Sequence, residues 1–351
     1  METTLHILAA VIILGAFLPL LRFDLWIVRG WDFPQLQFFV VGMPVFVLLI
    51  ATGVNGKAET GLLAVLGLGL LWMGWGIFHY TPMAGKRVRD GEGGVRLSVM
   101  VSNVLMSNRE SGKLLELLRS YQPDIFVALE TDQWWVDQLS EISADYQHSV
   151  ELPQDDTYGM LVRSRIPLED LKVEYLLRGN IPSVHCFIRL DDGTKIRVHA
   201  LHPKPPFPDE DTSSTDRDAE LLMVGKRVKE QGDPSIVLGD MNDVAWSHTT
   251  RLFQRTSGLL DPRIGRGFFS TFHAEHRWMR WPLDHMFISK EFRVCRIERL
   301  PYVGSDHFPM FAEFSYEPEK RAANDPLEED AGDRKEADEK ISDARKTDSL
   351  R

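Results

Sequence analysis

Three long apolar stretches occupy the start of the chain. Residues 4–21, 36–51 and 62–80 run almost without charge, and each approaches the ~20 residues that a helix needs to cross the hydrocarbon core of a bilayer. Pro44 lies inside the second stretch and glycines interrupt the third. Membrane helices tolerate both residues because lipid forces the backbone hydrogen bonds to close internally. The pattern predicts a transmembrane region at residues 1–80 with three helices.

Two other interpretations of these stretches are less consistent with the sequence. A cleaved signal peptide would open with positive residues, but only the negative Glu2 precedes the first apolar stretch. An apolar hairpin buried in a soluble protein would need polar sequence to cover it, and the first eighty residues offer too little. Membrane helices are therefore the favoured interpretation.

The positive charges of the flanking loops predict the orientation. Lys57 is the one positive residue between the second and third stretches. The opposite side carries five positive residues, which are Arg22, Arg29, Lys86, Arg87 and Arg89. Cytoplasmic loops are enriched in Lys and Arg, so the region after the third stretch is expected in the cytoplasm. A tilted or re-entrant second segment would reverse this orientation.

A different pattern begins after a linker at residues 81–94. Val95 to Asn103 alternates apolar and polar residues with the period of two that is typical of a half-buried strand. Helical leucine spacing follows at residues 111–119, and residues 216–230 give a second helix. The other expected strands are 124–129, 159–163, 183–190, 195–200, 235–239, 283–289, 292–300 and 310–315. Residues 95–316 are thus expected to form one α/β domain in which two sheets pack face to face and helices cover the outside.

Composition adds three further limits. Residues 317–351 are rich in Glu, Asp, Lys, Arg and Ala and poor in large apolar residues, which predicts a disordered charged tail. The whole chain carries a formal net charge of −11, which argues against general binding of polyanions. The two cysteines, Cys186 and Cys295, lie far apart in apolar runs. They exclude a disulfide framework and a thiolate zinc cluster.

Polar residues gather where the expected strands end. Gly239 is followed by Asp240, and Asn242 comes two residues later. Carboxylate and amide oxygens suit Mg²⁺ or Mn²⁺ and can also orient a water molecule. The same residues are ordinary turn formers, so this motif has a structural explanation as well.

Two Asp-His pairs give the second and third signals. Asp306 and His307 directly precede the last strand, and Asp284 and His285 open another strand. A buried carboxylate that faces an imidazole fixes its tautomer and raises its basicity. Taken alone, either pair is more often a loop hydrogen bond than a catalytic device.

In their order along the chain, these motifs resemble the endonuclease/exonuclease/phosphatase superfamily of divalent-metal-dependent phosphoesterases. The resemblance covers roughly residues 96–314. It rests on Ser102-Asn103-Val104, Leu129-Glu130, Tyr158-Gly159 with Ser164-Arg165-Ile166-Pro167-Leu168, the segment at His202, Gly239-Asp240-Met241-Asn242, Asp284-His285 and Ser305-Asp306-His307. The resemblance implies a four-layered α/β sandwich, which agrees with the strand pattern. The Pro-rich segment after His202 resembles membrane-bound bacterial members.

The resemblance also implies roles for single residues. Asn103 and Glu130 would help to hold Mg²⁺ or Mn²⁺, with Glu130 the principal carboxylate ligand and Asp306 a further ligand or a contact to metal-bound water. Asp240 would activate the attacking water, and Asn242 would help to place it. These roles describe an in-line displacement at phosphorus.

The remaining implied roles concern the phosphate. His307 would contact the scissile phosphate and stabilise its developing charge, and Asp284 would orient His307. His202 would bind a second phosphoryl oxygen, supported by Tyr158. The phosphate ester could belong to a nucleic acid, a nucleotide or a lipid headgroup. Aromatic and basic residues interleave at 273–281, where they could stack bases, touch lipid headgroups or pack on the core.

The sequence therefore predicts a membrane-tethered, metal-dependent hydrolase of phosphodiesters or phosphomonoesters, such as a phosphodiesterase, nuclease or phosphatase. We expect an integral multi-pass protein of the bacterial inner membrane with a cytoplasmic catalytic domain. The alternative from another class is a catalytically silent binding or scaffold domain of the same fold. Filled chemical positions in every motif favour the enzyme.

Overall fold

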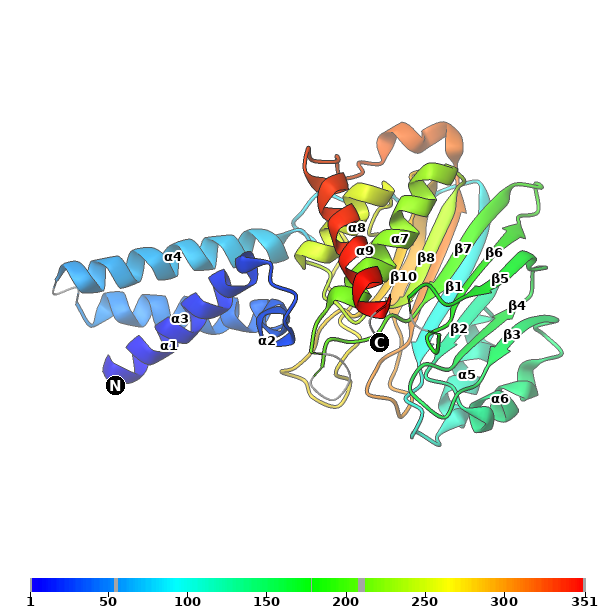
Figure 1. Cartoon of the computed structure of the whole chain (residues 1–351), viewed down its shortest axis with the longest axis horizontal. Coiled ribbons are helices and arrows are strands. Elements are labelled where there is room, and N and C mark those ends of the chain that lie inside the picture. The colour runs from blue at the N-terminus through cyan, green and yellow to red at the C-terminus, as the bar shows by residue number, and fades with distance from the viewer. Residues whose placement is uncertain (1, 54–55, 178, 208–211, 350–351) are drawn as a thin grey trace.

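Three apolar helices form a bundle that projects from the rest of the molecule (Figure 1). The computed structural model describes residues 2–53, 56–177, 179–207 and 212–349. The bundle consists of α1 (Glu2–Phe17), α3 (Gln35–Ala51) and α4 (Lys57–Phe78). Small residues bring these helices close together, since a Cβ on Gly42 would come within 2.6 Å of Leu70 Cδ2.

The bundle has the exposed apolar surface that a lipid environment requires. Leu71, Leu68 and Val47 are 73%, 62% and 58% exposed. The helices that carry them have no polar face, so apolar side chains are exposed all around the bundle. By length and composition, Glu2–Leu21 and Lys57–Phe78 can each cross a membrane. A third crossing requires that α2 (Trp26–Arg29), the short 3₁₀ helix after it and α3 act as one span bent by 65°.

Beyond the bundle lie two sheets. The six-stranded sheet has the order β10-β11-β1-β2-β4-β3, and the five-stranded sheet has the order β5-β6-β7-β8-β9. Both are mixed, because β1 and β2 pair parallel, as do β7 and β8, whereas the other pairs are antiparallel. The strands are β1 (Val95–Asn103), β2 (Ile125–Leu129), β3 (His148–Leu152), β4 (Met160–Ser164), β5 (Glu169–Glu174), β6 (Ser183–Arg189), β7 (Lys195–Leu201), β8 (Ser235–Asp240), β9 (Asp284–Ile288), β10 (Phe292–Arg299) and β11 (Met310–Tyr316).

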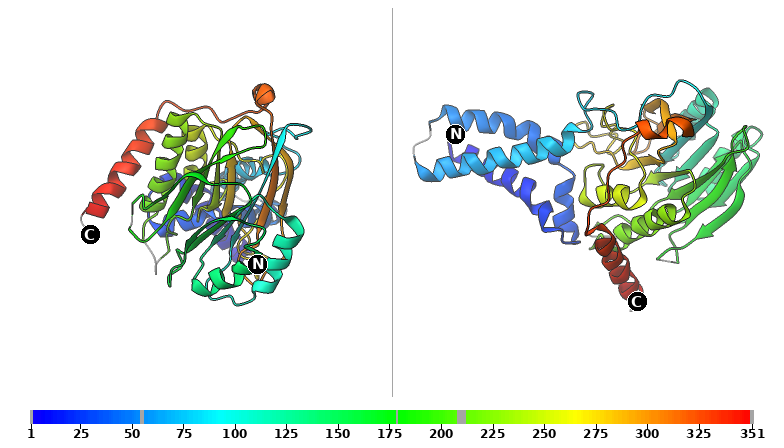
Figure 2. Two further views of the ribbon diagram at one scale, coloured as in Figure 1. Left: turned by 90° about the vertical axis from the view of Figure 1, so that its right-hand side faces the viewer. Right: turned by 90° about the horizontal axis from the view of Figure 1, so that it is seen from above.

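Helices cover the outer faces of both sheets, as Figures 1 and 2 show. α5 (Ser111–Tyr121) and α6 (Gln133–Leu139) pack on the six-stranded sheet. α7 (Thr215–Gln231) and α8 (His248–Ser257) pack on the five-stranded sheet. The apolar residues of the inner faces fill the space between the sheets. This arrangement confirms the predicted four-layered sandwich.

The bundle packs directly on one end of the sandwich. The Tyr80 hydroxyl donates to the carbonyl of Ala245 at 2.6 Å, and the Trp246 indole donates to the carbonyl of Asp32 at 2.7 Å. Phe33 and Trp281 meet edge to face in the same apolar cluster. The loop that follows β8 therefore lies against the apolar helical bundle.

The C-terminal segment differs from the expected disordered tail. Residues 333–349 form α9 (Asp333–Ser349), which packs on α7 and α8. Ala337, Ile341 and Ala344 are buried at helical spacing. The buried face of this helix is formed largely by alanines, so a prediction based on large apolar residues did not detect the helix. Residues 350 and 351 of the expected tail lie outside the described residues.

A partly buried lysine of α9, Lys340, gives a test of whether this helix is packed on the domain. Lys340 Nζ lies 2.9 Å from Asp218 Oδ2 and 2.6 Å from Asp24 Oδ1. Lys340→Ala is expected to lower the free energy of unfolding by about 1–3 kcal/mol, because Asp218 loses a partner while buried. Lys335, whose side chain is 82% exposed, is the control, with an expected effect below about 0.5 kcal/mol. Thermal unfolding of the solubilised full chain measures both variants, and equal shifts would contradict the packed helix.

Glu220 in α7 predicts a pH dependence of stability. Burial, with a smaller contribution from the charge of Asp216, raises the pKa of Glu220 to about 8. The folded protein therefore binds a proton that the unfolded chain releases above its ordinary pKa, and stability falls as the pH rises from about 4.5 to 8. Glu220→Gln is expected to stabilise the protein by about 3 kcal/mol at pH 9 and to have little effect at pH 4. An equal effect at both pH values would show that Glu220 is ionised in the folded state.

Candidate active site

The predicted site residues come from different strands and meet at one rim of the sandwich. Asn103 ends β1 and Asp240 ends β8, and both are strands with a parallel neighbour. Glu130 and His202 directly follow those neighbours, β2 and β7. Antiparallel β9 and β11 begin at the same rim, which brings Asp284, Asp306 and His307 to it. These polar side chains lie close together because the carboxyl ends of four strands and the amino ends of two strands are located at the same rim.

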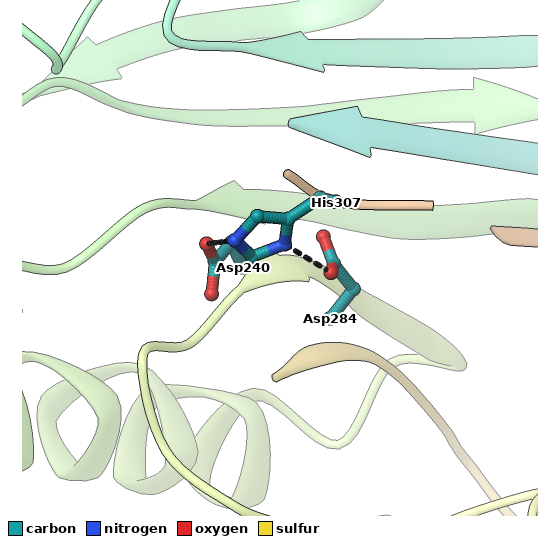
Figure 3. A group of neighbouring side chains, drawn as sticks. All are labelled: Asp240, Asp284 and His307. Carbon is teal, nitrogen blue, oxygen red and sulfur yellow. Dashed lines mark hydrogen bonds and ion pairs between the residues drawn. The ribbon is translucent and has the colours of Figure 1, made fainter. Parts of the chain in front are cut away.

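His307 lies between two carboxylates at the centre of the rim (Figure 3). Its Nδ1 is 2.8 Å from Asp284 Oδ2, and its Nε2 is 3.5 Å from Asp240 Oδ2. All three side chains are buried. The Phe272 ring packs on the imidazole with the ring centroids 4.9 Å apart. The ring orientation of His307 is therefore fixed on both edges and on one face.

The charges of the three groups depend on one another. Burial alone lowers the pKa of His307, but Asp284 and Asp240 outweigh it and raise the pKa to about 10. Burial raises the pKa of Asp240, yet His307, His202 and two donated hydrogen bonds bring this pKa below its ordinary value. Burial keeps the pKa of Asp284 raised despite His307. At neutral pH the rim therefore holds an imidazolium beside an ionised Asp240.

Asn103 joins two of the acidic residues. Its Nδ2 donates to Glu130 Oε1 at 2.7 Å and to Asp240 Oδ2 at 3.2 Å, whereas its Oδ1 accepts from the Leu105 amide at 3.0 Å. The Asn103 side-chain amide thus orients the carboxylates of Glu130 and Asp240. That the Asn103 Oδ1 atom also binds a metal ion stays a prediction. Glu130 has a φ of +60° and Asn242 a φ of +50°, a conformation that non-glycine residues adopt at some cost in energy.

His202, Tyr158 and Asn242 complete the predicted set. His202 Nε2 lies 3.9 Å from Asp240 Oδ2, and the Tyr158 ring lies 5.8 Å from the His202 ring, centroid to centroid. The Asn242 amide N–H donates to Asp240 Oδ1 at 2.9 Å, but its side chain donates to the carbonyl of Pro203 at 3.0 Å. Asn242 therefore ties the loop after β7 to the loop after β8 and positions Asp240 through its backbone.

Two features of the rim were not apparent from the motifs. The Ser305 hydroxyl donates to the carbonyl of Asn103 at 2.8 Å and accepts the His307 amide N–H at 3.0 Å, so it holds the His307 loop on β1. His285 points away from Asp284: it contacts the Arg263 guanidinium at 2.7 Å and the carbonyl of Asp243 at 2.9 Å. Asp284 therefore pairs with His307, and the adjacent His285 is structural.

The donors at the rim fit a divalent cation. The donor atoms of Asp240, Asp284 and His307 lie within 4.8 Å of one another. Both ring nitrogens of His307 face carboxylates, and the raised pKa of His307 favours its protonated form, so a cation would compete with a bound proton. Glu130 and Asp306 stay the ligands predicted from the sequence. Burial raises the pKa of Glu130, whereas His202, Asn103 and His307 lower it and the charge of Asp306 raises it. Carboxylate oxygens are ligands that hard divalent cations prefer.

Packed mixed sheets with acidic and histidine side chains at one rim define the class of this protein. The model of the Endonuclease/Exonuclease/phosphatase family matches residues 100–307, more than half of the chain. The chain therefore belongs to this family, whose members are nucleases, phosphodiesterases and phosphatases. A comparison with curated proteins gives no match.

Solved structures share the fold at low sequence identity. TDP2 of D. rerio in complex with a single-strand DNA product is 17% identical with a TM-score of 0.52, over 63% of this chain and 99% of that chain. The human Nocturnin catalytic domain with bound sulfate is 19% identical with a TM-score of 0.52, over 63% and 94%. A family protein from Bacteroides thetaiotaomicron is 17% identical with a TM-score of 0.52, over 64% and 100%. At these identities the likeness establishes the fold.

Proposed function

We propose that the protein is a membrane-tethered, divalent-metal-dependent phosphoesterase that hydrolyses its substrate by in-line attack of water. The observation that carries this proposal is the buried His307 between Asp240 and Asp284. Burial of these three ionisable groups costs desolvation energy, and their convergence at the rim with Glu130 and His202 favours chemistry over a silent scaffold. TDP2 with its DNA product supports a phosphate-ester substrate by likeness of fold.

Asp240 and His307 are proposed to do the chemistry. Asp240 has a pKa below its ordinary value, so it is ionised at neutral pH and accepts a proton from the attacking water. His307 is positively charged and donates to a non-bridging oxygen of the scissile phosphate, where negative charge develops. His202 donates to a second phosphoryl oxygen, and Tyr158 packs beside it.

Glu130 and Asp306, assisted by Asn103, are proposed to hold Mg²⁺ or Mn²⁺. The bound cation would supply charge neutralisation at the phosphorus. Hydrogen bonds hold the proposed ligands in place, since Asn103 orients Glu130 and Ser305 fixes the loop of Asp306. Glu130 lies on a strained backbone that points its carboxylate into the rim.

Membrane attachment is proposed from the apolar bundle. Its helices have the length and the exposed apolar faces of membrane spans, and positive loop residues favour a cytoplasmic catalytic domain in a bacterial inner membrane. Because the loop after β8 packs on the bundle, the rim would lie close to the bilayer. This position suits a lipid headgroup as substrate, and nucleic acids and nucleotides remain to be compared with it.

The decisive experiment is hydrolysis by the solubilised full-length protein. The substrates are a chromogenic phosphodiester, DNA, RNA, nucleotides and phospholipids, each with Mg²⁺, with Mn²⁺ and with EDTA. We expect hydrolysis of at least one substrate class that EDTA abolishes and Mg²⁺ or Mn²⁺ restores. Inactivity on every substrate with either metal would favour the scaffold alternative. Activity that persists in EDTA would rule out the proposed dependence on a divalent metal.

Glu130→Gln tests the metal ligand. The substitution keeps the shape of the side chain but removes the negative charge, so the Mg²⁺ concentration for half-maximal activity is expected to rise about tenfold. Glu141→Gln is the matched control, since the Glu141 side chain is 54% exposed and pairs with Arg119. Unchanged activity of Glu130→Gln at limiting Mg²⁺ would rule out Glu130 as the principal ligand.

A further inference from the structure

A cavity of about 690 Å³ lies between the bundle and the sandwich, outside the catalytic rim. One wall is the first two turns of α3, with Leu36, Val40 and Val41. The other walls come from β10 and from the loop between residues 268 and 280. No predicted catalytic or metal-binding residue lines this cavity, so it is a second feature of the molecule.

The loop side of the cavity is positively charged. The guanidinium groups of Arg280 and Arg299 lie 5.0 and 4.3 Å from the centroid of the Phe308 ring. Their hydrogen bonds go to the carbonyl oxygens of Ala274 and Ser270. Within the described residues, neither guanidinium forms an ion pair with a carboxylate. Two neighbouring cations without an acidic partner form a site for an anion.

The remaining charged residues of the cavity do not cancel this charge. Glu298 is the one acidic residue among the described lining residues, and it is already paired with Arg296 at 2.7 Å. Arg277 adds a third guanidinium without an ion pair in the described part of the chain. Burial lowers the pKa of Arg299, and the charge of Arg280 lowers it further. The lining of the cavity therefore carries a net positive charge.

The helix side of the cavity continues into the apolar surface of the bundle. Val40 and Val41 are 52% and 48% exposed, and they lie on the outward face of α3. The Gln37 side chain donates to the carbonyl of Trp278 at 2.9 Å and fastens the loop to the helix. Trp278 itself is 83% exposed. Tryptophan beside a membrane helix is typical of the headgroup level.

We propose that this cavity binds one anionic phospholipid from the leaflet next to the catalytic domain. Its phosphate would pair with Arg280 and Arg299, and the start of an acyl chain would lie along Val40 and Val41. The inference rests on the membrane attachment proposed above. An anion alone would leave the apolar wall unused, and a lipid without net charge would leave the guanidinium groups uncompensated.

Native mass spectrometry of the full-length protein tests this proposal. The solubilised protein is equilibrated with equal amounts of phosphatidylglycerol and phosphatidylcholine, and we expect one phosphatidylglycerol to be retained in preference. The double variant Arg280→Gln/Arg299→Gln is expected to weaken this retention roughly 25-fold, about fivefold for each arginine. Val41→Trp fills the apolar end without a change of charge, and it is expected to weaken retention as well.

The controls separate the possible outcomes. Arg280→Lys/Arg299→Lys keeps the charge and should restore part of the retention, and Arg119→Gln, an exposed arginine on α5, should leave it unchanged. Equal retention of the two lipids, or no effect of the double variant, would overturn the proposal. Displacement by inorganic phosphate as effective as by phosphatidylglycerol would reduce it to a simple anion site. Release of the chain from membranes by alkaline carbonate would instead refute the membrane attachment itself.

Discussion

Asp240→Asn is expected to lower kcat roughly 10³- to 10⁴-fold, with KM changed little. The asparagine keeps the size of the side chain and can still face Asn103, but it cannot accept a proton from water. It also removes one of the three carboxylate charges, those of Asp284, Asp240 and Asp306, that raise the pKa of His307. Both losses act in the transition state, so kcat and not substrate affinity should fall. The measurement is steady-state kinetics on whichever substrate the panel identifies.

Asp233→Asn is the matched control for this prediction. Asp233 lies just before β8, at the opposite end of the strand from Asp240, and it pairs with Arg197 at 2.6 Å. Its substitution is expected to change kcat less than about twofold, because a partly exposed ion pair contributes little even to stability. A residual kcat in Asp240→Asn above a tenth of the wild-type value would show that another group activates the water.

The fold could be predicted to the extent that its elements carry a periodic apolar pattern. The strands in the middle of the sheets, such as β1 and β8, alternate or are wholly apolar and were located within a few residues. The edge strands β3 and β5 are short and largely polar, and they were missed. β3 and β5 bury few of their side chains, so their sequence carries little of the signal on which such a prediction depends, whereas the edge strand β9 is buried throughout and matches an expected strand.

The site could be predicted by position but not by pairing. Motifs at strand ends indicated which residues reach the rim, because parallel strands present their carboxyl ends together. Which carboxylate faces which imidazole depends on side-chain direction. Asp284 and His285 are neighbours on β9, and neighbours on a strand point to opposite faces. His285 is therefore directed to Arg263, and Asp284 is directed across the rim to His307.

The contribution of the bundle could not be read from the sequence at all. The apolar stretches predict membrane helices, but not that Trp246 and Tyr80 fasten the catalytic rim to them. These contacts join residues more than 160 positions apart, and neither carries a recognisable motif. For the membrane-tethered hydrolase proposed above, this attachment would hold the rim in one orientation toward the bilayer, without the freedom of a flexible linker.

The pairing of His307 with Asp284 predicts strongly non-additive losses of activity. Asp284→Asn removes the acceptor that holds Nδ1 at 2.8 Å, and kcat is expected to fall roughly 10²-fold, because His307 loses its orientation and much of its charge. His307→Ala removes the phosphate contact itself and is expected to cost roughly 10³-fold. The double variant should be no slower than His307→Ala, because the carboxylate acts through the imidazole.

Tyr158→Phe supplies the comparison for this cycle. Tyr158 packs beside His202, whereas Asp284 pairs with His307, so Tyr158→Phe and Asp284→Asn should lose activity multiplicatively when combined. Circular dichroism of each variant checks that the fold survives the loss of a buried group. If the His307 and Asp284 variants also combined multiplicatively, the two residues would act separately: Asp284 would serve the loop before β9, and His307 would contact the phosphate without it.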